Sequence, residues 1–216
     1  DSEAEISIDK RNSVGVSVCG NYPVSGNISI ELSPAKPAEF TLALRIPQWS
    51  KTTTAKLISG SDTLNISLDN LPAGEYAKVD RKWKKGDRIE LSLDLTPHLL
   101  ELNGHQAVVR GPIVLARDSR FNDGFVDECV VIQSSEDGSV ALTPAEGNDF
   151  AWMSFTAPMV AGADLEGNGK PRQIHLCDFA SAGNTWDKST RYKVWLPKTL
   201  NVTKGEYRAY NDAPHN

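Results

Sequence analysis

The sequence has no apolar run near the ~20 residues that a membrane-spanning helix needs, and it has no block of basic residues. Its 23 lysines and arginines stand against 28 aspartates and glutamates, which gives a formal net charge of -5. A mildly acidic chain of this kind lacks the electrostatic footprint of a nucleic-acid-binding protein. We therefore expect neither a nucleic acid nor a membrane among its partners.

Cysteine and histidine are also scarce, with three cysteines and four histidines in 216 residues. Cys19, Cys129 and Cys177 are widely spaced, form no Cys-x-x-Cys pair and share no metal-ligand spacing with a histidine. This pattern favours small buried thiols, and one disulfide with a spare thiol stays open as the alternative. The sequence predicts no metal site in this chain.

Motifs of hydrolytic catalysis are missing as well. There is no Gly-x-Ser-x-Gly elbow and no glycine-rich phosphate loop. A glycosidase normally needs two carboxylates flanking the scissile bond, and Asp178 and Asp187 bracket one loop, but solvated loop carboxylates are the commoner explanation. Residues 164–169 begin like a calcium-binding loop, yet His175 stands where a glutamate ligand belongs, which favours a polar turn. We predict no catalytic residue here.

What the sequence does contain is apolar residues at every second position. Such alternation predicts strands with one buried and one solvated face, and it recurs at 14–18, 28–32, 40–46, 64–68 and 89–95. No window of 11 or more residues fits a helical stripe, and only 97–101 fits a single helical turn. Short strands joined by turns at roughly ten-residue spacing predict an all-β protein, an antiparallel β-sandwich of the jelly-roll kind.

The strand pattern changes along the chain. Regular alternation predicts an antiparallel β-sandwich over residues 1–118. Longer loops follow, and we interpret 119–200 either as a second, smaller, loop-rich β unit or as an excursion whose last strand rejoins the first sandwich. The polar stretch 201–216 is interpreted as a linker or tail.

Three signatures occur in a fixed order: Arg-Ile-Pro-Gln-Trp at 45–49, Gly-Glu-Tyr at 74–76 leading into Arg-Lys-Trp-Lys-Lys-Gly-Asp at 81–87, and Arg-Gly-Pro-Ile-Val at 110–114. The loop at 177–186 and the Val-Trp strand near residue 195 continue the series. Together they resemble the region that follows the catalytic barrel in glycoside hydrolase family 127, the β-L-arabinofuranosidase-like enzymes.

The resemblance implies a non-catalytic accessory region, C-terminal to an (α/α)6-barrel catalytic domain of the same polypeptide that is absent here. Enzymes of that family use a zinc-bound cysteine nucleophile with glutamate and cysteine ligands. This chain has neither a Cys-Cys pair nor a Glu-x-Cys sequence, so zinc is expected only in the absent domain and no cofactor in this chain. The resemblance also implies a secreted bacterial protein, periplasmic or extracellular, although no signal peptide occurs in the sequence.

An alternative is a carbohydrate-binding module for plant glycans that contain arabinose. Asn184, Trp186 and Asp187 share one loop and are its candidate binding residues, because an aromatic face can stack on a sugar ring. Trp83 and Trp195 lie within strand patterns and are expected to pack inside a sandwich. A free-standing enzyme is the least favoured reading. If the chain docks on a larger partner, an exposed apolar patch that includes Trp49 or Trp186 is expected.

Overall fold

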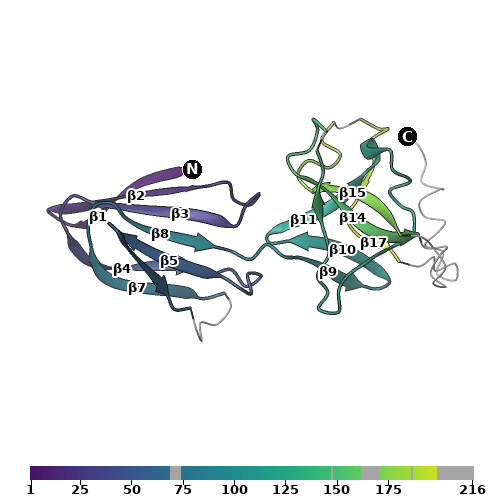
Figure 1. Ribbon diagram of the computed structural model, residues 1–216. Helices are drawn as coiled ribbons and strands as arrows, with labels where there is room; N and C mark the ends of the chain where they lie inside the picture. The colour runs from purple at the N-terminus through teal and green to yellow at the C-terminus, as the bar shows by residue number, and fades with distance from the viewer. Residues whose placement is uncertain (69–73, 147, 162–170, 186, 199–216) are drawn as a thin grey trace. The chain divides into compact units, whose positions relative to one another are not determined.

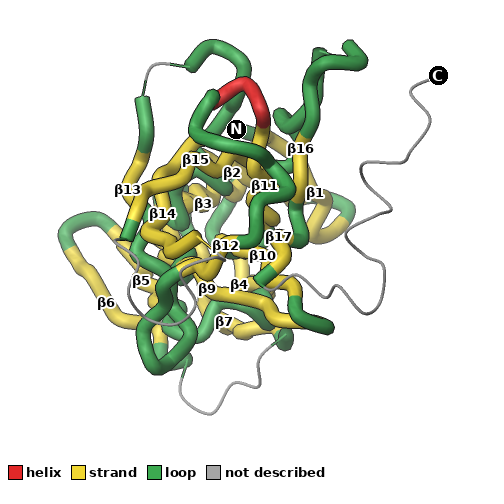
Figure 2. Tube along the Cα trace, turned by 90° about the vertical axis from the view of Figure 1, so that its right-hand side faces the viewer, coloured by secondary structure: helices red, strands yellow, loops and turns green. Residues whose placement is uncertain are grey.

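The computed structural model describes residues 1–68, 74–146, 148–161, 171–185 and 187–198. Contacts divide the chain into two compact units, Asp1–Leu95 and Thr96–Asn216. The described regular structure is antiparallel β throughout, apart from one 3₁₀ turn at Ser119–Phe121 that is red in Figure 2. The predicted all-β, sandwich-like class is confirmed.

Unit 1 is built from two sheets, one of six strands and one of two, as Figure 1 shows for the part that runs from purple to teal. The larger sheet has the order β1-β2-β3-β8-β5-β6, and the smaller one pairs β4 with β7. The strands are β1 (Ser2–Asp9), β2 (Asn12–Gly20), β3 (Asn27–Pro34), β4 (Ala38–Arg45), β5 (Thr54–Ser59), β6 (Asp62–Ile66), β7 (Tyr76–Trp83) and β8 (Asp87–Ser92).

The core of unit 1 lies between these sheets and follows the predicted alternation. Trp83 is completely buried, and its indole Nε1–H donates to the Phe40 carbonyl oxygen at 2.9 Å, which satisfies the one polar group that the ring carries. Leu32 and Ile89 are also completely buried, from two neighbouring strands of the large sheet. The Arg81 guanidinium lies 5.4 Å from the Trp83 ring centroid, as expected for side chains two positions apart on one strand.

The edge strand β1 is the least covered part of unit 1. Nearly all of its residues are exposed, and the Ile6 side chain is 52% exposed although it belongs to the inward-facing series. Among the described strands β1 pairs only with β2, in the register Glu3 to Ser17 and Glu5 to Gly15. A two-stranded sheet spans less width than a six-stranded one, so part of the larger sheet's inner face stays uncovered within the unit.

Unit 2 is organised around one strand path, β12-β14-β15-β11-β10-β17, with β9 added to β10, β16 added to β11 and β13 added to β14. Its strands are β9 (Pro97–Leu102), β10 (His105–Arg110), β11 (Ile113–Asp118), β12 (Val130–Ile132), β13 (Thr143–Pro144), β14 (Ser154–Ala161), β15 (Arg172–Asp178), β16 (Tyr192–Lys193) and β17 (Leu196–Pro197). Its buried residues include Leu115, Ile174 and Leu176.

Gln106 joins two strands of unit 2 that lie far apart along this path. Its buried side-chain amide donates to the Val130 carbonyl oxygen, and its Oε1 accepts from the Ile132 backbone N–H at 3.2 Å. The amide therefore provides β12 with the donor and acceptor that a neighbouring strand would offer. β10 and β12 are held together by a side chain instead of a ladder.

The structure differs from the sequence prediction at the domain boundary. We expected the first unit to end at residue 118, but the two units meet between Leu95 and Thr96. The physical reason is pairing, because β10 and β11 bond to β17, β15 and β16. The last strands do rejoin residues from the expected first sandwich, but these belong to unit 2. Residues 97–101, expected as a helical turn, form β9 because they pair along β10. The tail at 201–216 lies outside the described residues.

The burial of β8 can be tested with two adjacent substitutions. Leu91 is buried between the sheets, and we expect Leu91→Asp to leave the protein unfolded or insoluble, because it removes ~1.5 to 3 kcal/mol of apolar burial and adds an unpaired carboxylate to the core. Ser92→Asp lies on the opposite face and should change the melting temperature little. Similar melting of both variants in circular dichroism would contradict the strand register.

The bridging role of Gln106 gives a second test. Gln106→Leu keeps the approximate volume but leaves the Val130 carbonyl and the Ile132 N–H without their partner, so the free energy of unfolding should fall by ~2 to 5 kcal/mol. Gln173→Leu changes an exposed glutamine on β15 and serves as the matched control. Urea denaturation measures both, and equal stabilities of the two variants would argue against the bridge.

Candidate functional site

The candidate site of unit 2 is built on the turn that follows β15, residues 178–184. Asp178 closes β15 and is almost completely buried. Its Oδ1 accepts from the Met153 backbone N–H at 2.8 Å, and its Oδ2 accepts from the Ser181 backbone N–H at 3.0 Å. The Ser181 hydroxyl donates to the same carboxylate at 2.9 Å. Asp178 is therefore a structural anchor of the turn, and not the solvated loop carboxylate expected from the sequence.

A second buried carboxylate, Asp118 at the end of β11, holds the other side of the turn. Its Oδ2 accepts from the Gly183 backbone N–H at 2.9 Å and from Arg120 Nη2 at 2.7 Å, and its Oδ1 accepts from Arg120 Nε at 2.9 Å. Burial acts to raise the pKa of Asp118, but the hydrogen bonds from Arg120 and Gly183 outweigh it and hold the pKa below its ordinary value. The group is thus a carboxylate paired with an arginine.

Arg120 extends this network to the exposed end of the turn. Its Nη1 donates to Asn184 Oδ1 at 2.7 Å, and its Nη2 donates to the Ser181 carbonyl oxygen at 2.9 Å. The guanidinium also lies 3.9 Å from the centroid of the Phe150 ring, within the range of a cation–π contact. The hydrogen bonds with Asp118 raise the pKa of Arg120, so the side chain stays charged.

Three exposed aromatic side chains surround this braced turn. Phe179 is 50% exposed, Tyr192 46% and Trp152 57%. The Phe179 and Tyr192 rings have centroids 5.9 Å apart and planes inclined at 58°. The Trp152 backbone N–H donates to Ser181 Oγ at 2.9 Å, which ties that residue to the same turn. Phe179 and Tyr192 were not predicted as sugar-stacking residues, because only tryptophans were considered for that role. Both lie in or near the loop at 177–186 and the Val-Trp strand that contribute to the family resemblance.

Of the three predicted sugar-binding residues, two are engaged in local hydrogen bonds. Asn184 accepts from Arg120 and donates from Nδ2 to the Phe150 carbonyl oxygen at 3.1 Å. Asp187 accepts from the backbone N–H groups of Ser189 and Thr190, both at 2.8 Å. Hydrogen bonds from the Ser189, Thr185 and Thr190 side chains hold the pKa of Asp187 well below its usual range. Trp186 lies outside the described residues. Asn184 and Asp187 therefore shape the loop.

The burial of three other tryptophans agrees with the prediction only in part. Trp83 is buried as expected, whereas Trp195, which lies just before the two-residue strand β17, is 39% exposed. Trp49 is partly buried and packs against the core of unit 1.

A buried arginine on β11, Arg117, forms a second charged cluster in unit 2. Its Nη2 lies 3.3 Å from Glu128 Oε2 and 3.5 Å from Asp123 Oδ1. Glu128 also pairs with Arg172 at 2.6 Å, and Asp123 accepts from the His175 backbone N–H at 2.6 Å. These ion pairs fix residues 123–128 against β15 and β11. Their partners are internal, which is typical of a structural network.

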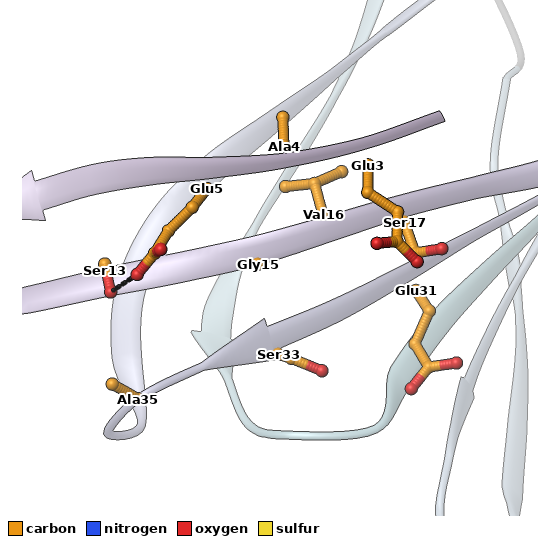
Figure 3. A pocket seen from close by; sticks show the side chains of 10 residues that line it. All are labelled: Glu3, Ala4, Glu5, Ser13, Gly15, Val16, Ser17, Glu31, Ser33 and Ala35. Atoms are coloured by element: carbon orange, nitrogen blue, oxygen red, sulfur yellow. Dashed lines mark hydrogen bonds between the residues drawn. The ribbon is translucent and has the colours of Figure 1, made fainter. Parts of the chain in front are cut away.

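Unit 1 has a separate polar hollow of about 670 Å³ on the outer face of β1, β2 and β3. Figure 3 shows its short lining side chains, among them Ser13, Ser17 and Ser33, together with Glu5 and Glu31. The Ser13 hydroxyl donates to Glu5 Oε1 at 2.7 Å (Figure 3). The hollow is open because small residues follow one another on this face.

The described residues do not fit a zinc site. No three of their His, Cys, Asp or Glu side chains form a group that could hold a metal ion. The three cysteines are free thiols, and burial raises the pKa of Cys177 to about 12, which disfavours the thiolate that zinc binds. Residues 164–169, with the calcium-like spacing, lie outside the described part. Within that part, no helix is long and apolar enough to cross a bilayer.

The ion pair beneath the turn predicts a pH-dependent loss of stability. Asp118→Asn keeps the shape but removes the charge, and the free energy of unfolding at pH 7 should fall by ~1.5 to 3 kcal/mol. Because the pKa of Asp118 is lowered in the folded state, its stabilisation is present above the ordinary carboxyl pKa of ~3.9 and disappears as the pH falls through the lowered value. The two proteins should therefore converge in acid.

Urea denaturation between pH 7 and pH 2.5 measures this difference. Asp149→Asn, which changes an exposed aspartate of the same unit, is the matched control and should match the unsubstituted protein. A stability difference for Asp118→Asn that is the same at every pH would contradict the assignment.

Comparison with known proteins adds family information to this geometry. No curated protein matches the chain. Among solved structures, a GH127 β-L-arabinofuranosidase from Geobacillus stearothermophilus T6 has a TM-score of 0.70 at 21% identity and is matched over 92% of this chain and 32% of its own. A glycoside hydrolase (TM-score 0.68, 23% identity, 92% of this chain and 34% of its own) and a GH127 β-arabinofuranosidase (0.68, 22%, 93% and 34%) are similar.

These likenesses establish the fold, and the chain spans about a third of the length of the solved structures it matches. One protein-family model also matches part of the chain. It describes a middle domain, whereas the sequence resemblance indicated a region C-terminal to the catalytic barrel. Residues 2–95, which are unit 1, match the model of the β-L-arabinofuranosidase GH127 middle domain.

Proposed function

We propose that this chain is a non-catalytic accessory β region of a secreted bacterial glycoside hydrolase similar to the GH127 β-L-arabinofuranosidases. The observation that carries the proposal is the match of unit 1 to the middle domain of that family. Its partner is an (α/α)6-barrel catalytic domain of the same polypeptide, which would carry the zinc and act on β-L-arabinofuranosyl linkages. The full protein would work in the periplasm or outside the cell.

The chemistry of the described side chains supports an accessory role. Among the described acidic residues of unit 2, Asp118 and Asp178 are the most buried, and each carboxylate is engaged by backbone N–H groups or by Arg120. A general acid or base must reach the substrate's reacting atoms within hydrogen-bond distance. These two groups instead face inward and hold a turn.

Carbohydrate binding by the chain itself is a second candidate. The observation that favours it is the set of half-exposed aromatic rings around the braced turn of unit 2, at Phe179, Tyr192 and Trp152. Plant glycans that contain arabinose are the ligands that the family resemblance suggests. This role is compatible with the accessory one, because glycoside hydrolases act on carbohydrate.

The accessory role is tested by supplying the missing partner. The purified chain alone should release no arabinose from β-L-arabinofuranosides. Adding the barrel region of the parent protein in saturating amounts should raise the melting temperature of this chain by about 5 °C or more, because a partner that binds only the folded state stabilises it. An unrelated helical-barrel protein at the same concentration is the control. Arabinose release by the chain alone, or no shift with the parent barrel, would overturn the proposal.

A further inference from the structure

We propose that Phe179 and Tyr192 form a saccharide-stacking site on unit 2, on a turn to which the backbone of the exposed Trp152 is hydrogen-bonded. The stacking rings of this site differ from the one predicted by the sequence, Trp186, and the proposal rests on the chain being part of a carbohydrate-active protein. Its ligand class is a soluble oligosaccharide that presents a sugar ring at a chain end or as a side group.

The exposed rings lie on backbone that is held in place. A Cβ on Gly183 would lie 2.5 Å from the Tyr192 ring, so the ring packs directly on the bare glycine backbone. Gly183 has a φ of 64°, a conformation that side chains with a Cβ rarely adopt. The backbone of Phe179 is held by its N–H, which donates to the Val114 carbonyl oxygen at 3.0 Å, and its ring packs against that of Tyr192. Rings that are already ordered lose less conformational entropy on binding.

The turn that carries the rings is supported from beneath by charged side chains. Asp118, Asp178 and Arg120 bond to the backbone of residues 181 and 183, and the two carboxylates are almost completely buried. Buried charges are costly unless they are paired and hydrogen-bonded. Here they fix a short turn that presents Phe179 and its neighbours to solvent. A binding surface needs such rigid positioning, because small displacements of a contact group weaken recognition.

The residue types exposed around the turn indicate the kind of ligand. The large apolar side chains exposed around this turn are aromatic, and the loop that follows has the exposed polar residues Asn184, Thr185 and Asp187. Their side chains hydrogen-bond within the loop or with Arg120 and keep acceptor sites beyond those bonds. Aromatic faces beside amide, hydroxyl and carboxylate groups match a sugar, which has C–H faces and a rim of hydroxyls. A protein partner would more commonly meet a hydrophobic patch that is wider than single rings.

The geometry of the rings narrows the ligand further. With centroids 5.9 Å apart and planes inclined at 58°, Phe179 and Tyr192 cannot both lie flat under one planar polysaccharide surface. Such a pair can contact a single sugar unit with the face of one ring and the edge of the other. The site therefore fits a branch or chain end, and it does not fit a crystalline polymer.

The proposal is tested by calorimetric titration of the full 216-residue chain with arabino- and xylo-oligosaccharides, and by sedimentation with crystalline cellulose. At least one soluble oligosaccharide should bind, and cellulose should not. Phe179→Ala and Tyr192→Ala should each weaken that affinity roughly tenfold, which corresponds to ~1.4 kcal/mol. Phe125→Ala removes a ring that is 81% exposed elsewhere in unit 2, and it should bind like the unsubstituted chain.

Two conservative variants keep the test independent of folding. Tyr192→Phe retains the ring and should keep most of the affinity, whereas Phe179→Leu retains apolar volume but loses the aromatic face and should bind weakly at an unchanged melting temperature. Absence of binding by any oligosaccharide, equal affinities in all variants, or binding lost only where the melting temperature falls would overturn the site.

The outcome also separates this site from the accessory role. If no sugar binds and Phe179→Ala instead abolishes the thermal shift caused by the barrel region, the aromatic surface is a protein interface. The saccharide site would then be wrong, and the accessory function would stand.

Discussion

The arrangement of unit 2 depends on one constraint: two buried carboxylates must be fully hydrogen-bonded. Asp178 ends β15 and Asp118 ends the neighbouring antiparallel strand β11, and both carboxylates accept hydrogen bonds from backbone N–H groups of the turn at residues 178–184. The groups that satisfy them are backbone N–H groups of that turn and the Arg120 guanidinium. Satisfying the charges therefore determines the path of the chain from residue 178 to residue 184 and the position of the exposed rings. Loss of either charge would leave several donors without partners at once.

Strand positions and core faces could be predicted from the sequence, because a period of two directly reports which side chains share a face. Ile89, Leu91 and Leu93 are buried as the pattern indicates, while Leu95 lies beyond the end of β8 and is only partly buried. Alternation does not say which strand is the neighbour. The boundary at residue 95 is set by pairing of β10 and β11 with strands that come more than sixty residues later, and no local pattern reports this.

The candidate site shows the same division between local and distant information. The loop around Asn184 was found because its composition is distinctive, but the role of Asn184 was not. Its side chain accepts from Arg120, sixty-four residues earlier in the chain, and a single sequence contains no signal for that contact. The family match concerns unit 1 alone, whereas the aromatic site lies in unit 2. The two proposed roles, domain support and ligand contact, can therefore be tested by substitutions in different units.

The exposed edge strand β1 has a consequence for how the chain behaves at high concentration. A free strand edge can add a strand from another molecule, and natural proteins oppose this with charged side chains. Two copies that paired antiparallel through β1 would bring the carboxylates of Glu3 and Glu5 on one copy near those of the other. The repulsion between these like charges would oppose such pairing. Both glutamates line the hollow of unit 1. Substitutions that adapt this hollow to a new ligand should keep both charges, because neutral replacements would remove the repulsion that opposes pairing at the strand edge.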